Sequence, residues 1–188
     1  MRIIAGTYKS RSLKSMPGMD IRPTSDRLRE TLFNVLCAGN PEALTGSTWI
    51  DLFAGTGAVG LEAISRGATE VYFVEKAKGA ALLIGENLKS LKIATGFQIL
   101  ECDTLAAVRA LEGQKVGADF VFLDPPYRMT ETYSQVLRLL GETSVLRSSG
   151  QAIVEHEKKF DPGEGFGWLE RTRKLVQGDA ALSFYRKK

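Results

Sequence analysis

The stretch "DLFAGTGAVG" (residues 51–60) decides how the fold of this chain is interpreted. An apolar run that begins at Thr48 leads into it, glycines follow at positions 55, 57 and 60, and a helical pattern continues to residue 67. Glycines at this Gly-x-Gly-x-x-Gly spacing let the backbone approach a ligand, and exposed amides at the start of a helix can bind its polar groups. The spacing alone is a weak signal, but a strand before it and a helix after it are the context that the motif requires. The stretch therefore predicts a nucleotide-binding loop between a strand and a helix.

Short apolar runs and helical patterns alternate along most of the chain. Runs rich in Val, Ile and Phe predict strands at residues 48–53, 71–75, 97–101, 119–124 and 151–157. Apolar residues at three- and four-residue spacing predict helices between them, at residues 58–67, 80–92, 104–113 and 132–141. Strands that alternate with helices form right-handed crossovers, and these produce a mostly parallel sheet covered on both faces.

The C-terminal part departs from this alternation. Residues 168–176 and 181–188 predict two strands joined by a tight turn at Gly178 and Asp179, with no helix between them. The predicted fold is therefore α/β and Rossmann-like, with a mostly parallel seven-stranded sheet, a C-terminal antiparallel hairpin and helices on both faces.

The N-terminal part carries most of the positive charge. Residues 1–30 hold seven Lys or Arg against three Asp or Glu, while the whole chain has a net charge of only +3. Residues 2–13 predict a small hairpin, and residues 24–36 predict a helix with Thr24 or Ser25 as its N-cap. We expect residues 1–22 to form a basic hairpin or arm and residues 23–188 to form the main domain. Charge alone is equally compatible with a polyanion-binding arm and with a solvated terminus.

Two carboxylates near the glycine loop indicate which nucleotide it binds. Glu75 closes the next predicted strand, 20 residues after Gly55, where an acid can accept hydrogen bonds from both hydroxyls of a ribose. NAD shares this fingerprint, but Asp51 places a carboxylate where a dinucleotide site usually has apolar residues. A carboxylate there can receive a cationic amino group. S-adenosylmethionine has a ribose and an α-amino group and lacks a pyrophosphate, so it fits both acids.

A second unusual group follows the fourth predicted strand. In "VFLDPPYRMT" (residues 121–130), Asp124 comes directly after an apolar run, and Pro125, Pro126 and Tyr127 follow it. The carboxyl edge of a parallel sheet is where α/β folds bind their ligands. A dehydrogenase that transfers hydride to or from NAD would not require this tetrapeptide.

Together these motifs resemble class I S-adenosylmethionine-dependent methyltransferases that modify exocyclic amino groups of bases. "RIIAGTYKSRSL" and "IRPTSDRLRETLFNVL" further resemble the N-terminal signature of the RsmD family, the bacterial 16S rRNA guanine-N2 methyltransferases. The resemblance is nearly collinear over residues 1–127. It implies a Rossmann-like class I methyltransferase fold, S-adenosylmethionine as cofactor, and 16S rRNA or the assembled small ribosomal subunit as partner.

The resemblance also implies roles for the tetrapeptide. Asp124 and the carbonyl of Pro125 would accept hydrogen bonds from the amino group, and Pro126 would help to hold these acceptors in place. Tyr127 would stack on the flipped base. Guanine rather than adenine follows from the family resemblance alone, because both bases present an amino group to the same carboxylate.

The remaining expected site residues bind the cofactor or the RNA. The expected cofactor-binding residues are Asp51, Phe53, Gly55, Gly57, Glu75 and Asp103. Within this set, Asp103 would contact the adenine amino group, or cap the following helix, or both. The expected RNA-contacting residues are Arg2, Lys9, Arg11, Arg22 and Arg27, which would meet phosphates. An ion-pair network with Asp26 and Glu30 is the alternative for Arg22 and Arg27.

Other sequence features lead us to expect a cytoplasmic monomer without metal. No apolar run approaches the ~20 residues that cross a bilayer, and the N-terminus lacks the apolar region of a signal peptide. Two distant cysteines, Cys37 and Cys102, indicate neither a disulfide framework nor a zinc site. Two alternatives stay open: an adenine-N6 methyltransferase of DNA or RNA, which shares the tetrapeptide, and an NAD(P)-binding oxidoreductase, which shares the glycine loop.

Overall fold

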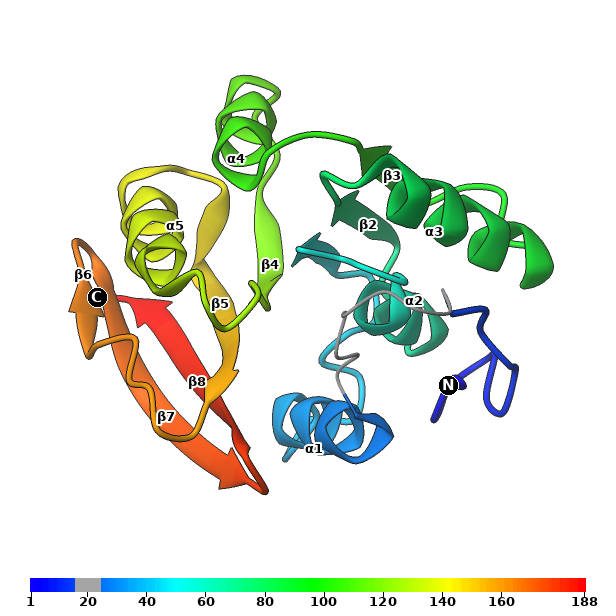
Figure 1. Cartoon of the computed structure of the whole chain (residues 1–188), viewed down its shortest axis with the longest axis horizontal. Helices are drawn as coiled ribbons and strands as arrows, with labels where there is room; N and C mark the ends of the chain where they lie inside the picture. The colour runs from blue at the N-terminus through cyan, green and yellow to red at the C-terminus, as the bar shows by residue number, and fades with distance from the viewer. Residues whose placement is uncertain (16–24) are drawn as a thin grey trace. The chain divides into compact units, whose positions relative to one another are not determined.

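A computed structural model describes residues 1–15 and 25–188 (Figure 1). The helices in these residues are α1 (Asp26–Leu36), α2 (Ala58–Ser65), α3 (Lys78–Ser90), α4 (Thr104–Gly113) and α5 (Thr130–Glu142). The strands are β1 (Thr48–Leu52), β2 (Glu70–Val74), β3 (Phe97–Leu100), β4 (Ala118–Leu123), β5 (Leu146–Glu157), β6 (Gly165–Phe166), β7 (Leu169–Gln177) and β8 (Ala180–Lys187). The alternation predicted from residue 48 onward is confirmed.

Two differences from the predicted strands are visible. The two-residue strand β6 was not predicted, so the described residues hold eight strands and not seven. Strand β5 also begins at Leu146, five residues before the predicted start, and includes the polar residues Ser148 and Ser149. Neither segment has the apolar run on which strand prediction depends.

The chain forms two compact units, Met1–Cys102 and Asp103–Lys188. In the first unit, β1 pairs with β2 and β2 pairs with β3, both in parallel. Helix α2 packs against β1 and β2, and α3 packs against β3. Because Leu52 lies opposite Val74 in the register, the residues that follow β1 and β2 meet at one edge of the sheet. This edge carries the glycine loop.

In the second unit, the strand order is β4-β5-β8-β7-β6. Strand β4 is parallel to β5, whereas β8 is antiparallel to both β5 and β7. The predicted C-terminal hairpin is therefore confirmed, and Figure 1 shows β7 and β8 side by side. Helix α5 packs against α4 and against β5, β6 and β7.

Apolar strand residues form the core of each unit. Ile50, Leu52 and Phe73 are completely buried in the first unit, as are Val121 and Ile153 in the second. Burying one such side chain contributes ~1.5–3 kcal/mol. The residues that follow these strands are consequently held at well-defined positions.

The N-terminal segment, residues 1–15, belongs to the first unit. The predicted hairpin is confirmed: Arg2 forms an antiparallel bridge with Ser12, and the Ile3 amide donates to the Arg11 carbonyl at 3.0 Å. Ser25 is the N-cap of α1, where its side chain accepts a hydrogen bond from the Leu28 amide. Thr24 and Arg22 lie outside the described residues. The predicted domain boundary at residue 22 stays a prediction.

No helix in residues 1–15 and 25–188 combines the length and apolarity that crossing a bilayer requires. The same residues gather no group of three or more His, Cys, Asp or Glu side chains that could hold a metal ion.

Candidate functional site

The glycine loop between β1 and α2 has an unusual backbone. Phe53, Gly55 and Gly57 have φ angles of +63°, +55° and +77°. Glycine adopts this left-handed region without a steric penalty, but Phe53 is a bulky residue for which it is strained by about 1–3 kcal/mol. The Gly57 amide donates to the Ala54 carbonyl at 2.7 Å and closes the turn. Such strain in a non-glycine residue is typical of functional sites, and it supports the predicted ligand-binding role of this loop.

The third glycine of the motif has a packing role. A Cβ at Gly60 would overlap the ring of Phe73 on β2. Its absence lets α2 approach the sheet closely and places the start of the helix at the loop. Gly55 and Gly57 therefore shape the loop, whereas Gly60 lets α2 pack closely against β2.

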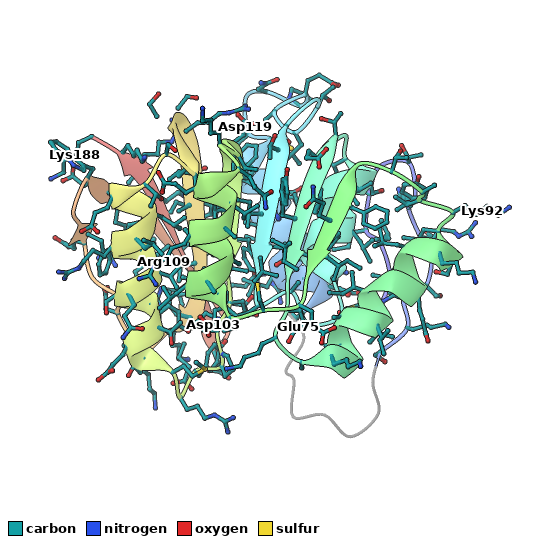
Figure 2. The ribbon with its side chains drawn as sticks, turned by 90° about the horizontal axis from the view of Figure 1, so that it is seen from above. Glu75, Lys92, Asp103, Arg109, Asp119 and Lys188 are labelled. Atoms are coloured by element: carbon teal, nitrogen blue, oxygen red, sulfur yellow. The ribbon has the colours of Figure 1, made fainter. Side chains whose placement is uncertain are left out.

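Glu75, which is labelled in Figure 2, lies directly after β2 and forms a hydrogen bond with the glycine loop. Its Oε2 accepts a hydrogen bond from the Gly55 amide at 2.9 Å, and its Oε1 accepts one from the Ala77 amide at 2.7 Å. Each carboxylate oxygen has two lone pairs, so both can accept a further donor. The half-buried carboxylate can thus bind two hydroxyl groups while it stabilises the loop.

Asp51 is a buried acid beneath this loop, with only 2% of its surface exposed. Its Oδ2 accepts a hydrogen bond from the Gly60 amide at 2.9 Å. Burial raises the pKa of Asp51 to about 7, the Gly60 amide lowers it, and the negative charge of Glu75 raises it further. A cationic ligand nearby would stabilise the charged form, which suits the predicted partnership with an amino group.

In the second unit, the predicted tetrapeptide directly follows β4. Pro125 is buried, Asp124 and Tyr127 are half-buried, and Pro126 is exposed. The Met129 amide donates to the Pro126 carbonyl at 2.7 Å, so a tight turn ends the group. Asp124 and Tyr127 thus follow a completely buried strand and precede a closed turn, which restricts the backbone on both sides.

Tyr133 in α5 supports this group, and sequence analysis missed it. Its ring is buried, and its hydroxyl donates to the Pro125 carbonyl at 3.4 Å. Burial raises the pKa of Tyr133, and the negative charge of Asp124 raises it further. The only sequence signal was a residue with a hydroxyl group on the apolar face of a helix. Tyr133 keeps this hydroxyl protonated, and therefore a donor, throughout the ordinary pH range.

Asp103 is the N-cap of α4, where its side chain accepts a hydrogen bond from the Leu105 amide at 3.0 Å. The capping alternative is therefore confirmed. Figure 2 shows Asp103, at the start of α4, and Asp119, near the start of β4, at opposite ends of these two elements. Because Asp119 lies at the start of β4, Asp103 lies toward the end at which β4 leads into Asp124. Its exposed carboxylate has lone pairs left for a ligand, and contact with adenine stays a prediction.

The predicted RNA-contacting residues are distributed over two segments. Arg2, Lys9 and Arg11 are exposed on the N-terminal segment, and Arg27 is exposed on α1. Arg22 lies outside the described residues. Within residues 1–15 and 25–188, Asp26 pairs with Arg29, which is completely buried and also lies 3.7 Å from the Glu62 carboxylate. Among the described residues, Arg27 forms no ion pair with Asp26 or Glu30, and the alternative stays untested for Arg22.

Comparisons with known proteins agree with this description. A solved structure of the Escherichia coli "Putative methyltransferase yhhF" matches with a TM-score of 0.82 and 28% identity over 100% of this chain and 98% of that one. A solved methylase from Haemophilus influenzae matches with a TM-score of 0.78 and 30% identity over 99% and 97%. The fold is thus that of class I methyltransferases, as predicted.

The family follows from sequence. Residues 1–186 match the family model described as "Conserved hypothetical protein 95". "Ribosomal RNA small subunit methyltransferase D" of Haemophilus influenzae is 36% identical over 84% of this chain and 79% of its own length. The protein of that name from Escherichia coli is 31% identical over 100% and 90%. The chain belongs to this family, the RsmD family that the motifs indicated.

Proposed function

We propose that this protein transfers a methyl group from S-adenosylmethionine to the exocyclic N2 amino group of a guanine in small-subunit (16S) rRNA. The observation that carries the proposal is the Asp-Pro-Pro-Tyr group, which directly follows β4 and whose Pro125 carbonyl accepts a hydrogen bond from Tyr133. Relatives named ribosomal RNA small subunit methyltransferases support rRNA as the substrate. Guanine N2 rests on the family resemblance.

The first unit would bind the cofactor. Bound S-adenosylmethionine supplies an electrophilic methyl group on a sulfonium sulfur. The amides of Gly55 and Gly57 would face its polar groups, and Phe53 would line the loop. Glu75 would accept hydrogen bonds from the ribose hydroxyls, and the buried Asp51 carboxylate would receive the α-ammonium group. From the second unit, Asp103 would accept a hydrogen bond from the adenine amino group while it caps α4.

The second unit would position the base. The lone pair of a guanine amino group is delocalised into the ring, so the nitrogen is a weak nucleophile. Asp124 and the Pro125 carbonyl would accept its two N–H bonds, aim its lone pair at the methyl group and stabilise the developing positive charge. Pro126 limits the backbone freedom of these acceptors. Tyr127 would stack on the flipped base, which contributes ~1–3 kcal/mol. The proton can leave after transfer, so Asp124 need not be a strong base.

The basic residues would bind the RNA backbone. Arg2, Lys9, Arg11, Arg22 and Arg27 would contact phosphates and orient the RNA without identifying bases. In this proposal residues 1–22 act as an RNA-binding arm on the methyltransferase domain, residues 23–188. The enzyme would act as a monomer in the cytoplasm, where the small ribosomal subunit is its partner.

The test is methyl transfer from labelled S-adenosylmethionine to small ribosomal subunits that contain unmodified rRNA, followed by identification of the labelled nucleoside. We expect N2-methylguanosine. Label in N6-methyladenosine, or absence of label from the RNA, would contradict the substrate assignment. Thermal stabilisation by NADH, without stabilisation by S-adenosylmethionine or S-adenosylhomocysteine, would contradict the cofactor assignment.

A further inference from the structure

Asn87 in α3 is a completely buried amide that joins two distant segments of the first unit. Its Oδ1 accepts a hydrogen bond from the Lys14 amide at 2.8 Å. Its Nδ2 donates to the Lys14 carbonyl at 3.2 Å and to the Thr56 carbonyl at 3.1 Å. Lys14 belongs to the N-terminal segment, and Thr56 lies between Gly55 and Gly57 in the glycine loop. The Asn87 side chain therefore forms hydrogen bonds with both the N-terminal segment and the glycine loop.

The N-terminal segment is also attached to α2, the helix that begins at the glycine loop. The Glu62 carboxylate accepts hydrogen bonds from the amides of Ile4 and Ala5 at 2.8 and 3.0 Å. Ser65 accepts two more, since its carbonyl bonds the Thr7 amide at 2.7 Å and its hydroxyl bonds the Tyr8 amide at 2.9 Å. These contacts fix the segment, while the side chains of Arg2, Lys9 and Arg11 stay exposed.

A simpler explanation is that Asn87 only satisfies buried backbone groups. The Lys14 contacts alone would serve that purpose for the N-terminal segment. The additional bond to Thr56 links the order of the glycine loop to the order of the segment, because one rigid amide can satisfy all three bonds only when both segments are in place. Asn87 is thus a positioning residue shared by two segments. Under the proposed function, the N-terminal segment binds RNA and the glycine loop binds the cofactor.

We propose that Asn87 couples RNA binding at the N-terminal segment to cofactor binding at the glycine loop. This inference rests on the proposed function. A ligand that orders one segment lowers the entropic cost of ordering the other, so each ligand raises the affinity for its counterpart by the same factor. Couplings of this kind are typically about 5-fold or more.

The experiment measures the Kd of S-adenosylhomocysteine, which cannot support transfer, by calorimetry with and without small ribosomal subunits that carry unmodified rRNA. The ratio of the two Kd values is the coupling factor. Asn87→Asp keeps the acceptor for the Lys14 amide and removes both donated bonds. Asn87→Ala removes all three. The matched control is Glu86→Ala, which breaks the exposed ion pair between Lys14 and Glu86 (2.9 Å) and leaves Asn87 unchanged.

We expect a coupling factor of about 5 or more in the wild type and in Glu86→Ala, and a factor near 1 in both Asn87 variants. A merely structural role would lower the melting temperature and weaken both ligands without changing the ratio, and this result would overturn the proposal. So would a wild type that binds both ligands independently. A wild type that binds neither ligand would instead contradict the proposed function itself.

Hydrogen exchange on the wild type tests the same inference if the Asn87 variants do not fold. RNA without cofactor should slow exchange of the amides at residues 55–57. S-adenosylhomocysteine without RNA should slow exchange of the amides of Ile4, Ala5 and Lys14. Protection confined to the segment that binds each ligand would overturn the proposal.

Discussion

The carboxylate of Asp51 accepts a hydrogen bond from the amide of Gly60 at 2.9 Å, at a position where only 2% of the aspartate is exposed. This single bond offsets only part of the cost of burying the charge, and the pKa of Asp51 is raised from 3.8 to about 7. Two predictions follow from this relationship, one for the free protein and one for the complex with its cofactor.

In the free protein, the free energy of unfolding should decrease as the pH rises, because Asp51 is buried and resists ionisation. The folded state holds the proton up to about pH 7, whereas the unfolded chain releases it near pH 3.8. Folding is therefore favoured by this group below pH 3.8, and that advantage is lost between pH 3.8 and 7. Linkage puts the loss on the order of 4 kcal/mol.

Asp51→Asn should remove this loss. We expect the unfolding free energy of the variant, measured by urea denaturation, to exceed that of the wild type at pH 8 and to approach it at pH 4. The control is Glu86→Gln, which removes an exposed, ion-paired carboxylate and should change the unfolding free energy by less than about 1 kcal/mol at pH 8. A variant less stable than the wild type at pH 8 would show that the charged form of Asp51 is stabilising.

Cofactor binding should release a proton from Asp51. An ammonium group beside the carboxylate lowers its pKa, so at pH 6 the bound state loses a proton that the free state holds. Calorimetry of S-adenosylhomocysteine binding in buffers of different ionisation enthalpy measures this release. We expect a value approaching one proton for the wild type and near zero for Asp51→Asn. Equal values for the two proteins would place the ammonium group elsewhere.

Tyr133→Phe should slow methyl transfer without weakening the binding of the cofactor or of the RNA. The change removes the hydrogen bond to the Pro125 carbonyl and keeps the buried ring. A neutral hydrogen bond contributes about 0.5–1.5 kcal/mol, which corresponds to a decrease in kcat of about 2- to 13-fold. The comparison variant is Phe160→Leu, which alters the packing on the Tyr133 ring but keeps the hydroxyl. If Phe160→Leu reduces kcat as much as Tyr133→Phe, packing and not the hydrogen bond is responsible.

Asp124→Ala should abolish most of the activity and leave cofactor affinity intact. Loss of one oxyanion-hole donor lowers kcat by about 10²–10³-fold, and we expect a decrease of the same order when this acceptor at the developing charge is removed. Single-turnover transfer and the Kd of S-adenosylhomocysteine measure the two effects. Asp119→Ala offers a control on the same strand, because Asp119 lies at its other end and pairs with Arg147. Loss of cofactor binding in Asp124→Ala would assign Asp124 to the cofactor site.

Much of the fold could be predicted because its signals are local. Most residues of the parallel strands β1 to β4 are apolar, and the glycine spacing marks the turn after β1. Helix α1 shows the limit of this approach. Helical spacing in the sequence predicts one apolar face, made of Leu28, Leu32, Val35 and Leu36. The structure instead buries Arg29 and Phe33 beside Leu28 and Leu32. An arginine joins a buried face only because Asp26 and Glu62 accompany it, and Glu62 lies on another helix.

The residues that support the site could not be predicted either, because their partners also lie on other elements. Glu75 and Asp103 follow predicted strands, and Glu75 also lies 20 residues after Gly55. Asn87 has partners 31 and 73 residues away, and Tyr133 bonds a carbonyl on a different element. A buried polar residue reveals its role only when the tertiary structure supplies its partners.

The attachment of the N-terminal segment has a consequence for how this protein can change over evolutionary time. Glu62, Ser65 and Asn87 bind the amides and carbonyls of that segment and none of its side chains. Mutations that replace Ile4, Ala5 or Lys14 therefore keep every one of these anchoring bonds, provided that no proline is introduced. Gly6 is the exception, because any side chain there would collide with Ser65. Under the proposed function, the RNA contacts of this segment can therefore diverge between lineages while its attachment to α2 and α3 is inherited unchanged.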